Sequence, residues 1–268
     1  MADTLATTLA HYWKQYQAIS PWTVMVAYMV TLVVWGALFL SPQADRAAVA
    51  AVVIPAGVLL DYALHKLQTG RPNWKSALIT SSIVTVLLPP GINLGVALLA
   101  VTLAIASKHF LLVGFGGGAK RHVFNPAGFG VAVTAALFGY SLGWWPDSYV
   151  WLVVAFGLLN VWRVRKFTQV ISYAVVYLVL VTLVAGFPVG GLSYSSLASQ
   201  SLPVALPYFF ILFMLPEPVT SLQPRWSQIQ FGALAALVAF GVSYVPVIGG
   251  AAVIWGLLAA NVFARLRR

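Results

Sequence analysis

Long apolar runs separated by short polar stretches dominate the chain. Each run is bounded by charged residues or by Pro and Gly clusters, which is the pattern of membrane-spanning helices. We predict an all-α polytopic membrane protein with about ten transmembrane helices. The ten predicted segments are Trp22–Leu40, Ala47–Leu67, Ser76–Leu88, Ile92–Val113, Phe124–Leu142, Ser148–Trp162, Phe167–Gly186, Leu202–Leu215, Ser227–Tyr244 and Gly250–Phe263.

Two of these segments are too short to cross a bilayer as regular helices. Ser76–Leu88 and Leu202–Leu215 have 13 and 14 residues, whereas a spanning helix needs about 20. Each runs into prolines, at Pro89-Pro90 and at Pro216-Glu217-Pro218. Irregular backbone at membrane depth has to be buried in protein or to line a cavity. We therefore predict two short or broken helices beside a cavity.

The positions of the short segments predict an internal repeat. They are the third and the eighth of ten, so the chain divides into two sets of five with matching breaks. Because five is odd, the two copies have opposite orientations in the membrane. We predict cytoplasmic ends at 1–21 and 265–268, and a single membrane domain made of inverted five-helix repeats at 22–142 and 143–264.

Composition and charge agree with this interpretation. The chain has 268 residues, 61% hydrophobic and 7% charged, which is too few charges for a soluble domain. With the N-terminus inside, fourteen of the fifteen Lys and Arg residues fall in cytoplasmic segments, and only Arg46 lies outside. Both termini are predicted to be cytoplasmic, with the lipid bilayer as a partner. The net charge of +10 is spread over short loops, which argues against nucleic acid, and without cysteine there are no thiolate-bound clusters or disulfides.

The central stretch from Gly114 to Val133 gathers the features that the rest of the chain lacks. Three glycines, Gly116–Gly118, are followed by Lys120, Arg121 and His122, and Asn125-Pro126 opens the next apolar segment. A flexible loop, two cations and a helix N-terminus are suited to binding an anion. An ordinary cytoplasmic loop, whose cations only set orientation, explains the same residues equally well.

Only five acidic residues are present, and three of them, Asp3, Asp45 and Asp147, are predicted to be solvated. Asp61 lies within the second segment, where a carboxylate costs about 2.5–3.5 kcal/mol near a helix centre. An interfacial pairing with His65 or Lys66 and a functional role are both open for Asp61. Glu217, held between two prolines, is suited either to bind a ligand N–H or to cap neighbouring amides.

The polar run that Glu217 begins continues through Thr220 and Arg225. No catalytic residue and no metal site is predicted. Haem is disfavoured, because His65, His109 and His122 fall at segment ends rather than inside a bundle.

Several motifs resemble the NqrB/RnfD family, the flavin-carrying membrane subunits of sodium-pumping NADH:quinone oxidoreductase and of the Rnf electron-transport complex. Ser76-Ala77-Leu78-Ile79-Thr80, running to Leu88-Pro89-Pro90, is similar to that family's third span. Lys108-His109-Phe110 with Phe124-Asn125-Pro126-Ala127, and Met214-Leu215-Pro216-Glu217-Pro218-Val219-Thr220, are similar to two further family motifs. The resemblance extends from about Ala47 to Gln230.

The resemblance implies two inverted five-helix halves, related to urea channels, in the bacterial cytoplasmic (inner) membrane. It also implies a bound flavin, FMN or riboflavin, and electron exchange with a cytoplasmic flavin or NAD(P)H reductase. The chain lacks the Ser-Gly-Ala-Thr motif to which larger members attach FMN, so we expect non-covalent binding. Whether the chain is part of an oxidoreductase or a channel for a small polar solute stays open.

The expected ligand-binding residues come from the two cytoplasmic breaks. They are Lys120, Arg121, Asn125, Pro126, Glu217, Thr220 and Arg225. The positive-inside rule accounts for the cations but not for Asn125, Glu217 or Thr220. We therefore predict that the side chains of Asn125 and Glu217 converge, less than about 15 Å apart (ten residues of helical rise), in a pocket that faces the cytoplasm.

Overall fold

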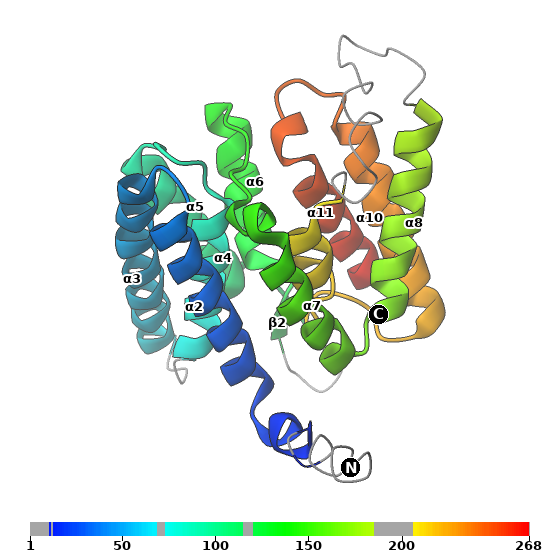
Figure 1. Ribbon diagram of the computed structural model, residues 1–268, viewed down its shortest axis with the longest axis horizontal. Coiled ribbons are helices and arrows are strands. Elements are labelled where there is room, and N and C mark those ends of the chain that lie inside the picture. Colours follow the sequence, from blue (N-terminus) through cyan, green and yellow to red (C-terminus); the bar gives the residue numbers. More distant parts are fainter. Residues whose placement is uncertain (1–10, 12, 69–72, 115–119, 185–205, 268) are drawn as a thin grey trace, which may run out of the picture.

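The computed structural model describes residues 11, 13–68, 73–114, 120–184 and 206–267, and these are mostly helical (Figure 1). Its α-helices are α2 (Pro21–Phe39), α3 (Gln43–Leu67), α4 (Trp74–Leu87), α5 (Leu94–Phe110), α6 (Pro126–Phe138), α7 (Val150–Val164), α8 (Phe167–Val184), α10 (Arg225–Val242) and α11 (Ala252–Leu266). Helices α2 to α5 lie on one side of the molecule and α8, α10 and α11 on the other, with α6 and α7 between them (Figure 1).

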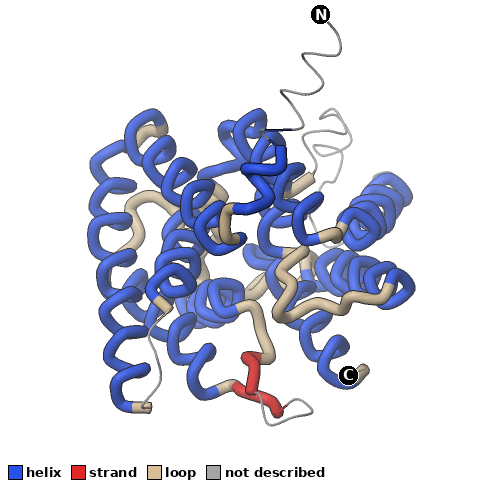
Figure 2. Tube along the Cα trace, turned by 90° about the horizontal axis from the view of Figure 1, so that it is seen from below, coloured by secondary structure: helices blue, strands red, loops and turns tan. Residues whose placement is uncertain are grey.

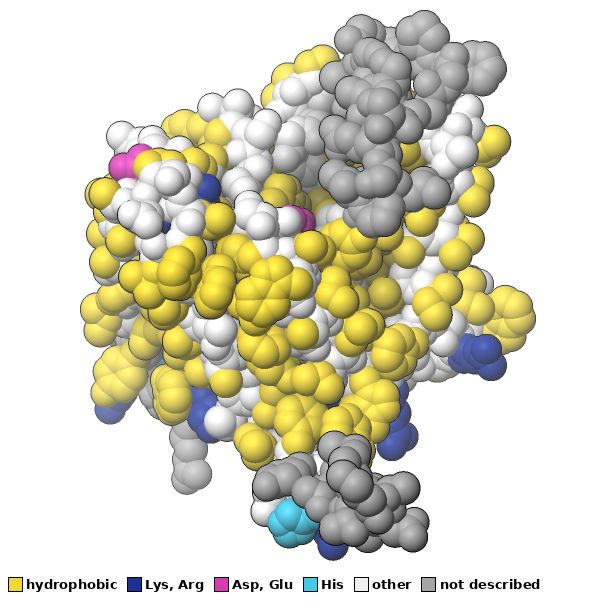
Figure 3. All heavy atoms as spheres, viewed as in Figure 1, with side chains coloured by type: hydrophobic (Ala, Val, Ile, Leu, Met, Phe, Trp, Pro, Cys, Tyr) yellow, Lys and Arg dark blue, Asp and Glu magenta, His cyan; other side chains and the backbone are white. Residues whose placement is uncertain are grey.

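Three stretches of described helix are long and apolar enough to cross a membrane: Pro21–Phe39, Gln43–Leu67 and Gly249–Leu266. Four shorter apolar helices accompany them, at Trp74–Leu87, Leu94–Phe110, Pro126–Phe138 and Phe167–Leu183. Hydrophobic side chains cover the flank of the molecule seen in Figure 3, and most of the Lys and Arg side chains visible there gather towards its lower end. These features are compatible with a membrane protein.

The two short helices predicted from the prolines are confirmed as far as they are described. Helix α4 has 14 residues and is capped by the Asn73 side chain, which accepts from the Ser76 N–H. Leu88 then turns to extended backbone before Pro89. In the eighth segment residues 202–205 lie outside the described residues. The rest forms a single π-helical turn, η3 (Phe210–Met214), and ends at Pro216.

The all-α prediction needs one correction. The fourth segment was expected to be helical to Val113, but α5 ends at Phe110. Strand β1 (Leu112–Gly114) then pairs antiparallel with β2 (Lys120–His122), which forms a short hairpin (red in Figure 2). The two strands run antiparallel, so their backbone groups pair with each other instead of along a helix.

The prediction that Asp147 is solvated is also wrong. Asp147 lies in the short 3₁₀ helix η1 (Trp145–Tyr149) that precedes α7, and its Oδ1 accepts from the backbone N–H of Phe209 at 2.8 Å. The side chain is half-buried there. Burial raises the pKa of the Asp147 carboxyl to about 7, although the Phe209 N–H acts in the opposite direction.

Two pairs of neighbouring helices pack through a glycine in closely similar ways. A Cβ built on Gly130 of α6 would lie 2.2 Å from the Ala100 carbonyl oxygen and 2.8 Å from the Ala104 Cβ of α5. A Cβ on Gly256 of α11 would lie 2.2 Å from the carbonyl oxygen of Ala235 and 2.9 Å from the Cβ of Ala239, both in α10. The backbones therefore approach so closely that no side chain fits between them.

The end of α4 is held by hydrogen bonds from the connection between α6 and α7. The indole Nε1 of Trp145 donates to the Leu88 carbonyl at 2.7 Å, and the Gly143 N–H donates to the Leu87 carbonyl, also at 2.7 Å. The carbonyls of Leu87 and Leu88 have no intrahelical partner because α4 ends at this point. Trp145 is fully buried, so these contacts fix the break firmly.

Candidate ligand site at the helix break

Asn125 stands at the start of α6 and makes contacts in three directions. Its Oδ1 accepts from the Gly128 N–H at 2.8 Å, which caps the helix. Pro126 follows at the first helical position, where a missing N–H is tolerated. Because Oδ1 is used by the cap, Nδ2 points away from the helix and donates to Glu217 Oε2 at 3.0 Å. The predicted convergence of Asn125 and Glu217 is confirmed.

Glu217 lies in the turn that follows the π-helical residues. Its Oε2 accepts from Asn125 and also from the Thr220 hydroxyl at 2.7 Å, while its backbone carbonyl accepts from the Ser221 hydroxyl at 2.6 Å. Oε1 is 3.6 Å from His122 Nε2, and the Glu217 side chain is 23% exposed. One carboxylate oxygen is thus held by two hydrogen bonds, and the other makes only the longer contact with His122.

The sequence did not identify Asn261 of α11 as part of this site. Its side chain is fully buried, with Oδ1 accepting from the Asn125 N–H at 2.8 Å and Nδ2 donating to the Thr220 carbonyl at 3.4 Å. Asn261 therefore joins the start of α6 to the turn after the break. A lone amide inside an apolar segment was the signal, because polar side chains at such positions usually have a partner.

Three polar side chains hold the broken segment and the polar run that follows it. Asn160 of α7 donates to the Leu212 carbonyl at 2.8 Å, and Gln169 of α8 donates to the Leu215 carbonyl at 2.6 Å. A helix that ends at prolines leaves carbonyls without intrahelical partners, and these two side chains supply the missing donors. The ammonium of Lys166, which is fully buried, donates to the Leu222 carbonyl beyond the break.

A cavity of ≈ 130 Å³ adjoins the network on its apolar side. Glu217, Asn125 and Asn160 are among its polar lining residues, and Ile79, Ile83 and Phe213 are among the apolar ones. Lipophilic walls with a few convergent polar groups are typical of ligand pockets, although such pockets usually measure about 300–1,000 Å³.

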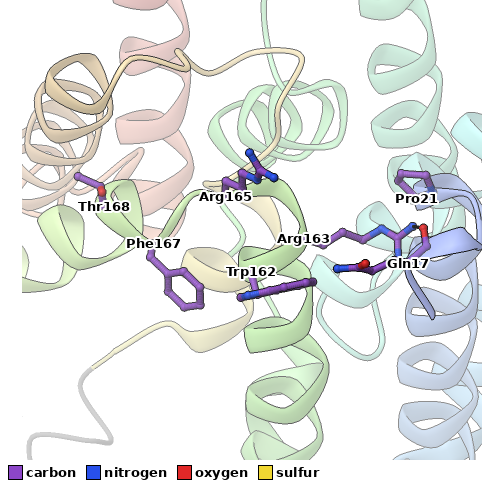
Figure 4. Close-up of a pocket in the computed structure, with 7 residues that line it drawn as sticks. All are labelled: Gln17, Pro21, Trp162, Arg163, Arg165, Phe167 and Thr168. Carbon is purple, nitrogen blue, oxygen red and sulfur yellow. Dashed lines mark hydrogen bonds between the residues drawn. The ribbon is translucent and has the colours of Figure 1, made fainter. Parts of the chain in front are cut away.

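A wider, more open pocket of ≈ 640 Å³ lies beside this cavity and shares Pro21 and Arg163 with it (Figure 4). Its other lining residues are Gln17, Trp162, Arg165, Phe167 and Thr168. Figure 4 shows Arg163 extending from α7 toward Gln17 and Pro21. The Arg163 guanidinium donates to the Tyr16 carbonyl at 2.9 Å and to the Ile19 carbonyl, so it fixes the start of α2 against α7.

The structure brings together four of the seven residues expected to bind a ligand: Asn125, Pro126, Glu217 and Thr220. The expected cations are placed differently. Lys120 and Arg121 lie on β2 with exposed side chains, and Arg225 is exposed at the first position of α10. The three glycines of the expected anion site, Gly116–Gly118, fall outside the described residues.

Neither a scan against protein-family models nor a search of curated proteins finds a match for this chain.

Proposed function

We propose that the chain is the membrane subunit of a flavin-dependent electron-transport system of the RnfD/NqrB type, and that it binds flavin without a covalent bond. The observation that carries the proposal is the Asn125–Glu217–Thr220 network at a helix break, next to a cavity. The motif resemblance supports the same assignment. A separate cytoplasmic reductase would deliver the electrons.

The polar groups of the network suit the edge of a flavin ring. That edge carries one N–H flanked by two carbonyl oxygens. Glu217 Oε1 offers an acceptor for the N–H, and His122 Nε2 lies 3.6 Å from it on a neighbouring element. The second hydrogen on Asn125 Nδ2 offers a further donor. A carboxylate that accepts from a ligand N–H forms a charge-assisted hydrogen bond, which is stronger than a neutral one.

The two adjoining hollows supply the room that a flavin needs. The open pocket of ≈ 640 Å³ falls within the usual range for a cofactor of this size. Trp162 and Phe167 offer apolar surface for the rings, and Arg165 offers a cation for the phosphate of FMN. When bound, the flavin supplies the electron-transfer chemistry, while the residues of the chain bind and orient it.

The inverted repeat of two five-helix halves is part of the same proposal. It is supported by the matched packing of Gly130 on α5 and Gly256 on α10, and by helix breaks in equivalent places of the two halves. A ligand site between the halves is usual for such folds, and the network spans them through Asn125 and Glu217.

We further propose that the chain lies in a bacterial inner membrane with both termini in the cytoplasm. The distribution of Lys and Arg along the sequence supports this orientation. Figure 1 places the start of α2, the end of α11 and β2 toward the lower end of the molecule, the end at which Lys and Arg gather in Figure 3. The reductase would meet that end.

The test is flavin binding by the purified full-length chain. We expect a flavin absorption spectrum, and no fluorescent band at the mass of the chain after denaturing electrophoresis. Glu217→Gln removes the charged acceptor, worth about 1.5–3 kcal/mol, so its flavin affinity should fall at least about tenfold. Asp45→Asn, at an exposed acid in the first turn of α3, is the control and should bind normally. Colourless protein that takes up no added flavin would overturn the proposal.

The size of the inner cavity favours a second candidate, a channel or transporter for a small polar solute. At ≈ 130 Å³ the cavity beside Glu217 is smaller than common cofactor pockets. The same carboxylate and amide groups would bind an uncharged solute that carries N–H and C=O groups. Solute flux in proteoliposomes without any electron donor, abolished by Glu217→Gln, would favour this candidate over flavin binding.

A further inference from the structure

Four ionisable side chains form a buried cluster at the ends of α3 and α5, apart from the break. We call Asp61, His65, Lys108 and His109 the Asp61 cluster. Asp61 is 1% exposed; its Oδ1 lies 3.1 Å from His109 Nε2 and 3.0 Å from Lys108 Nζ. Its Oδ2 lies 3.2 Å from His65 Nδ1. The sequence left open a local pairing with His65 or Lys66; His65 does contact Asp61, whereas the Lys66 ammonium lies over the Tyr62 ring, 5.6 Å from its centroid.

We propose that Asp61, His65 and His109 form a binding site for a divalent transition-metal ion such as Zn²⁺ or Fe²⁺. One ligand atom from each residue lies within 4.8 Å of the others. Metal–ligand bonds of about 2.0–2.2 Å place neighbouring ligand atoms roughly 3.0–3.5 Å apart, and both histidine–carboxylate distances fall in that interval. Two histidines and one carboxylate are a common ligand set for such ions.

The hydrogen bond made by the other nitrogen of His109 points to the same conclusion. His109 Nδ1 lies 3.0 Å from Gln68 Oε1, an acceptor, so Nδ1 carries the proton. When His109 is neutral, its Nε2 lone pair faces a carboxylate oxygen 3.1 Å away, and a cation between these two acceptors removes their repulsion. When His109 is protonated, Nε2 donates to that oxygen and no metal binds there. A hydrogen-bond acceptor on Nδ1 is also the usual companion of a histidine that binds metal through Nε2.

The second oxygen of Asp61 is also without a donor. Oδ2 is buried and, among the residues that the structure describes, accepts no hydrogen bond. A buried carboxylate oxygen left in this state carries a desolvation cost. A metal ion bound to Oδ2 and His65 Nδ1 removes that cost. It has to replace the hydrogen bond between His65 Nδ1 and the Asp61 backbone carbonyl oxygen, which lie 2.9 Å apart, and the proton of His65 then resides on Nε2.

Lys108 is the competitor for this site. Its ammonium already occupies one side of Asp61 Oδ1, and a buried ion pair alone would account for that contact. A metal ion has to displace the ammonium from Oδ1 or tolerate its charge nearby, so Lys108 weakens metal binding. A metal site and a purely structural ion pair therefore respond differently to the loss of Lys108. Removing Lys108 strengthens metal binding if the cluster is a metal site, whereas a purely structural cluster has no affinity for metal with or without Lys108.

Equilibrium dialysis of the purified, metal-stripped chain against Zn²⁺ tests the proposal. We expect one Zn²⁺ per chain and a loss of affinity of at least about tenfold in His65→Asn and in His109→Asn. The same tenfold loss is expected in Gln68→Leu, because Gln68 accepts from the other nitrogen of His109 and so orients the ring. Lys108→Met should bind Zn²⁺ more tightly than wild type. His11→Asn, at an exposed histidine near the N-terminus, is the matched control and should behave as wild type.

Co²⁺ provides a second measurement that needs no variant with an altered buried histidine. Co²⁺ bound to the wild-type chain should give the visible spectrum of a nitrogen- and oxygen-ligated ion, and excess Zn²⁺ should abolish it. Wild-type and Lys108→Met chains that both fail to bind Zn²⁺ and Co²⁺ would overturn the proposal. So would Zn²⁺ binding that is unchanged in the His65→Asn/His109→Asn double variant. None of these results depends on flavin binding.

Discussion

Replacing Gly130 by alanine should destabilise the protein through the contact between α5 and α6. The new Cβ would lie 2.2 Å from the Ala100 carbonyl oxygen and 2.8 Å from the Ala104 backbone nitrogen. Favourable contacts between heavy atoms are about 3.5–4.0 Å long, so the two helices would have to separate by more than about 1 Å. The obstacle is backbone and cannot rotate away.

The magnitude follows from the cost of overpacking. Extra methyl groups in packed interiors cost about 1–3 kcal/mol, and a clash with backbone belongs at the upper end of that range. We expect Gly130→Ala to lower the free energy of unfolding by about 3 kcal/mol. Gly256→Ala meets the same set of atoms in α10, at 2.2, 2.9 and 3.0 Å, so its cost should be equal within about 0.5 kcal/mol.

Unfolding in mixed detergent, followed by tryptophan fluorescence, measures both variants. The control is Gly241→Ala in α10, where a Cβ meets nothing within 4 Å. Alanine there should leave stability unchanged or raise it by up to about 1 kcal/mol, because glycine is the poorer helix former. If alanine at position 130 costs as little as at position 241, the close approach of α5 and α6 is wrong. A large difference between positions 130 and 256 would contradict the proposed repeat.

Two further variants test contacts outside the ligand site. The Asp147 carboxyl has a folded-state pKa of about 7, above its value of about 3.9 in an unfolded chain. Its contribution to the free energy of unfolding is therefore full below pH 4 and is lost as the pH rises through 7. Asp147→Asn should remove this decline from a pH series of thermal unfolding. Trp145→Phe leaves the Leu88 carbonyl without its donor and should lower the free energy of unfolding by about 2–3 kcal/mol in the same assay. The control is Trp226→Phe, at a tryptophan that is 76% exposed, which should lower it by less than about 0.5 kcal/mol.

The parts of the fold that were predictable from sequence are those that depend on single strong signals. Apolar runs specify helices in a bilayer because backbone groups must be paired within the segment. Two prolines close together stop a helix here, whereas α3 continues through the single Pro55, so the stops after Leu88 and Leu215 were visible in advance. The convergence of Asn125 and Glu217 was predicted by comparing the polar residues at the helix breaks, because the positive-inside rule does not account for either residue.

The contacts that were not predictable depend on how each helix is rotated about its axis. Segments that are apolar on every side give no preferred face, so hydropathy does not indicate which neighbour a polar residue meets. Lys108 looked like one of the loop cations, yet it reaches Asp61, 47 residues away in sequence. Asn261 was hidden in the same way within the last segment. The hairpin was missed because strands of three residues, β1 and β2, have no periodicity to detect.

The hydrogen bonds that Asn160 and Gln169 donate to the broken segment offer a test that connects the fold to the ligand site. Asn160→Leu replaces the donor to the Leu212 carbonyl by an apolar side chain of similar size. That carbonyl lies in the π-helical turn and would be left without a partner inside the protein, at a cost of about 1–3 kcal/mol. Thr31→Val is the control, because the Thr31 hydroxyl bonds only to the Ala27 carbonyl of its own helix, and it should cost less than about 0.5 kcal/mol.

The Asn160→Leu variant should also bind its ligand less tightly. Glu217 lies only five residues after Leu212, and its backbone N–H donates to the carbonyl of Met214 in the same segment at 3.4 Å. Once the turn can move, Asn125 and Thr220 hold Glu217 Oε2 less firmly, so the affinity for flavin or solute should fall together with stability. If Asn160→Leu chains lose stability but bind ligand as tightly as wild type, Asn125 and Thr220 position Glu217 without help from the Asn160 hydrogen bond. That result would refute the proposed dependence of ligand binding on Asn160.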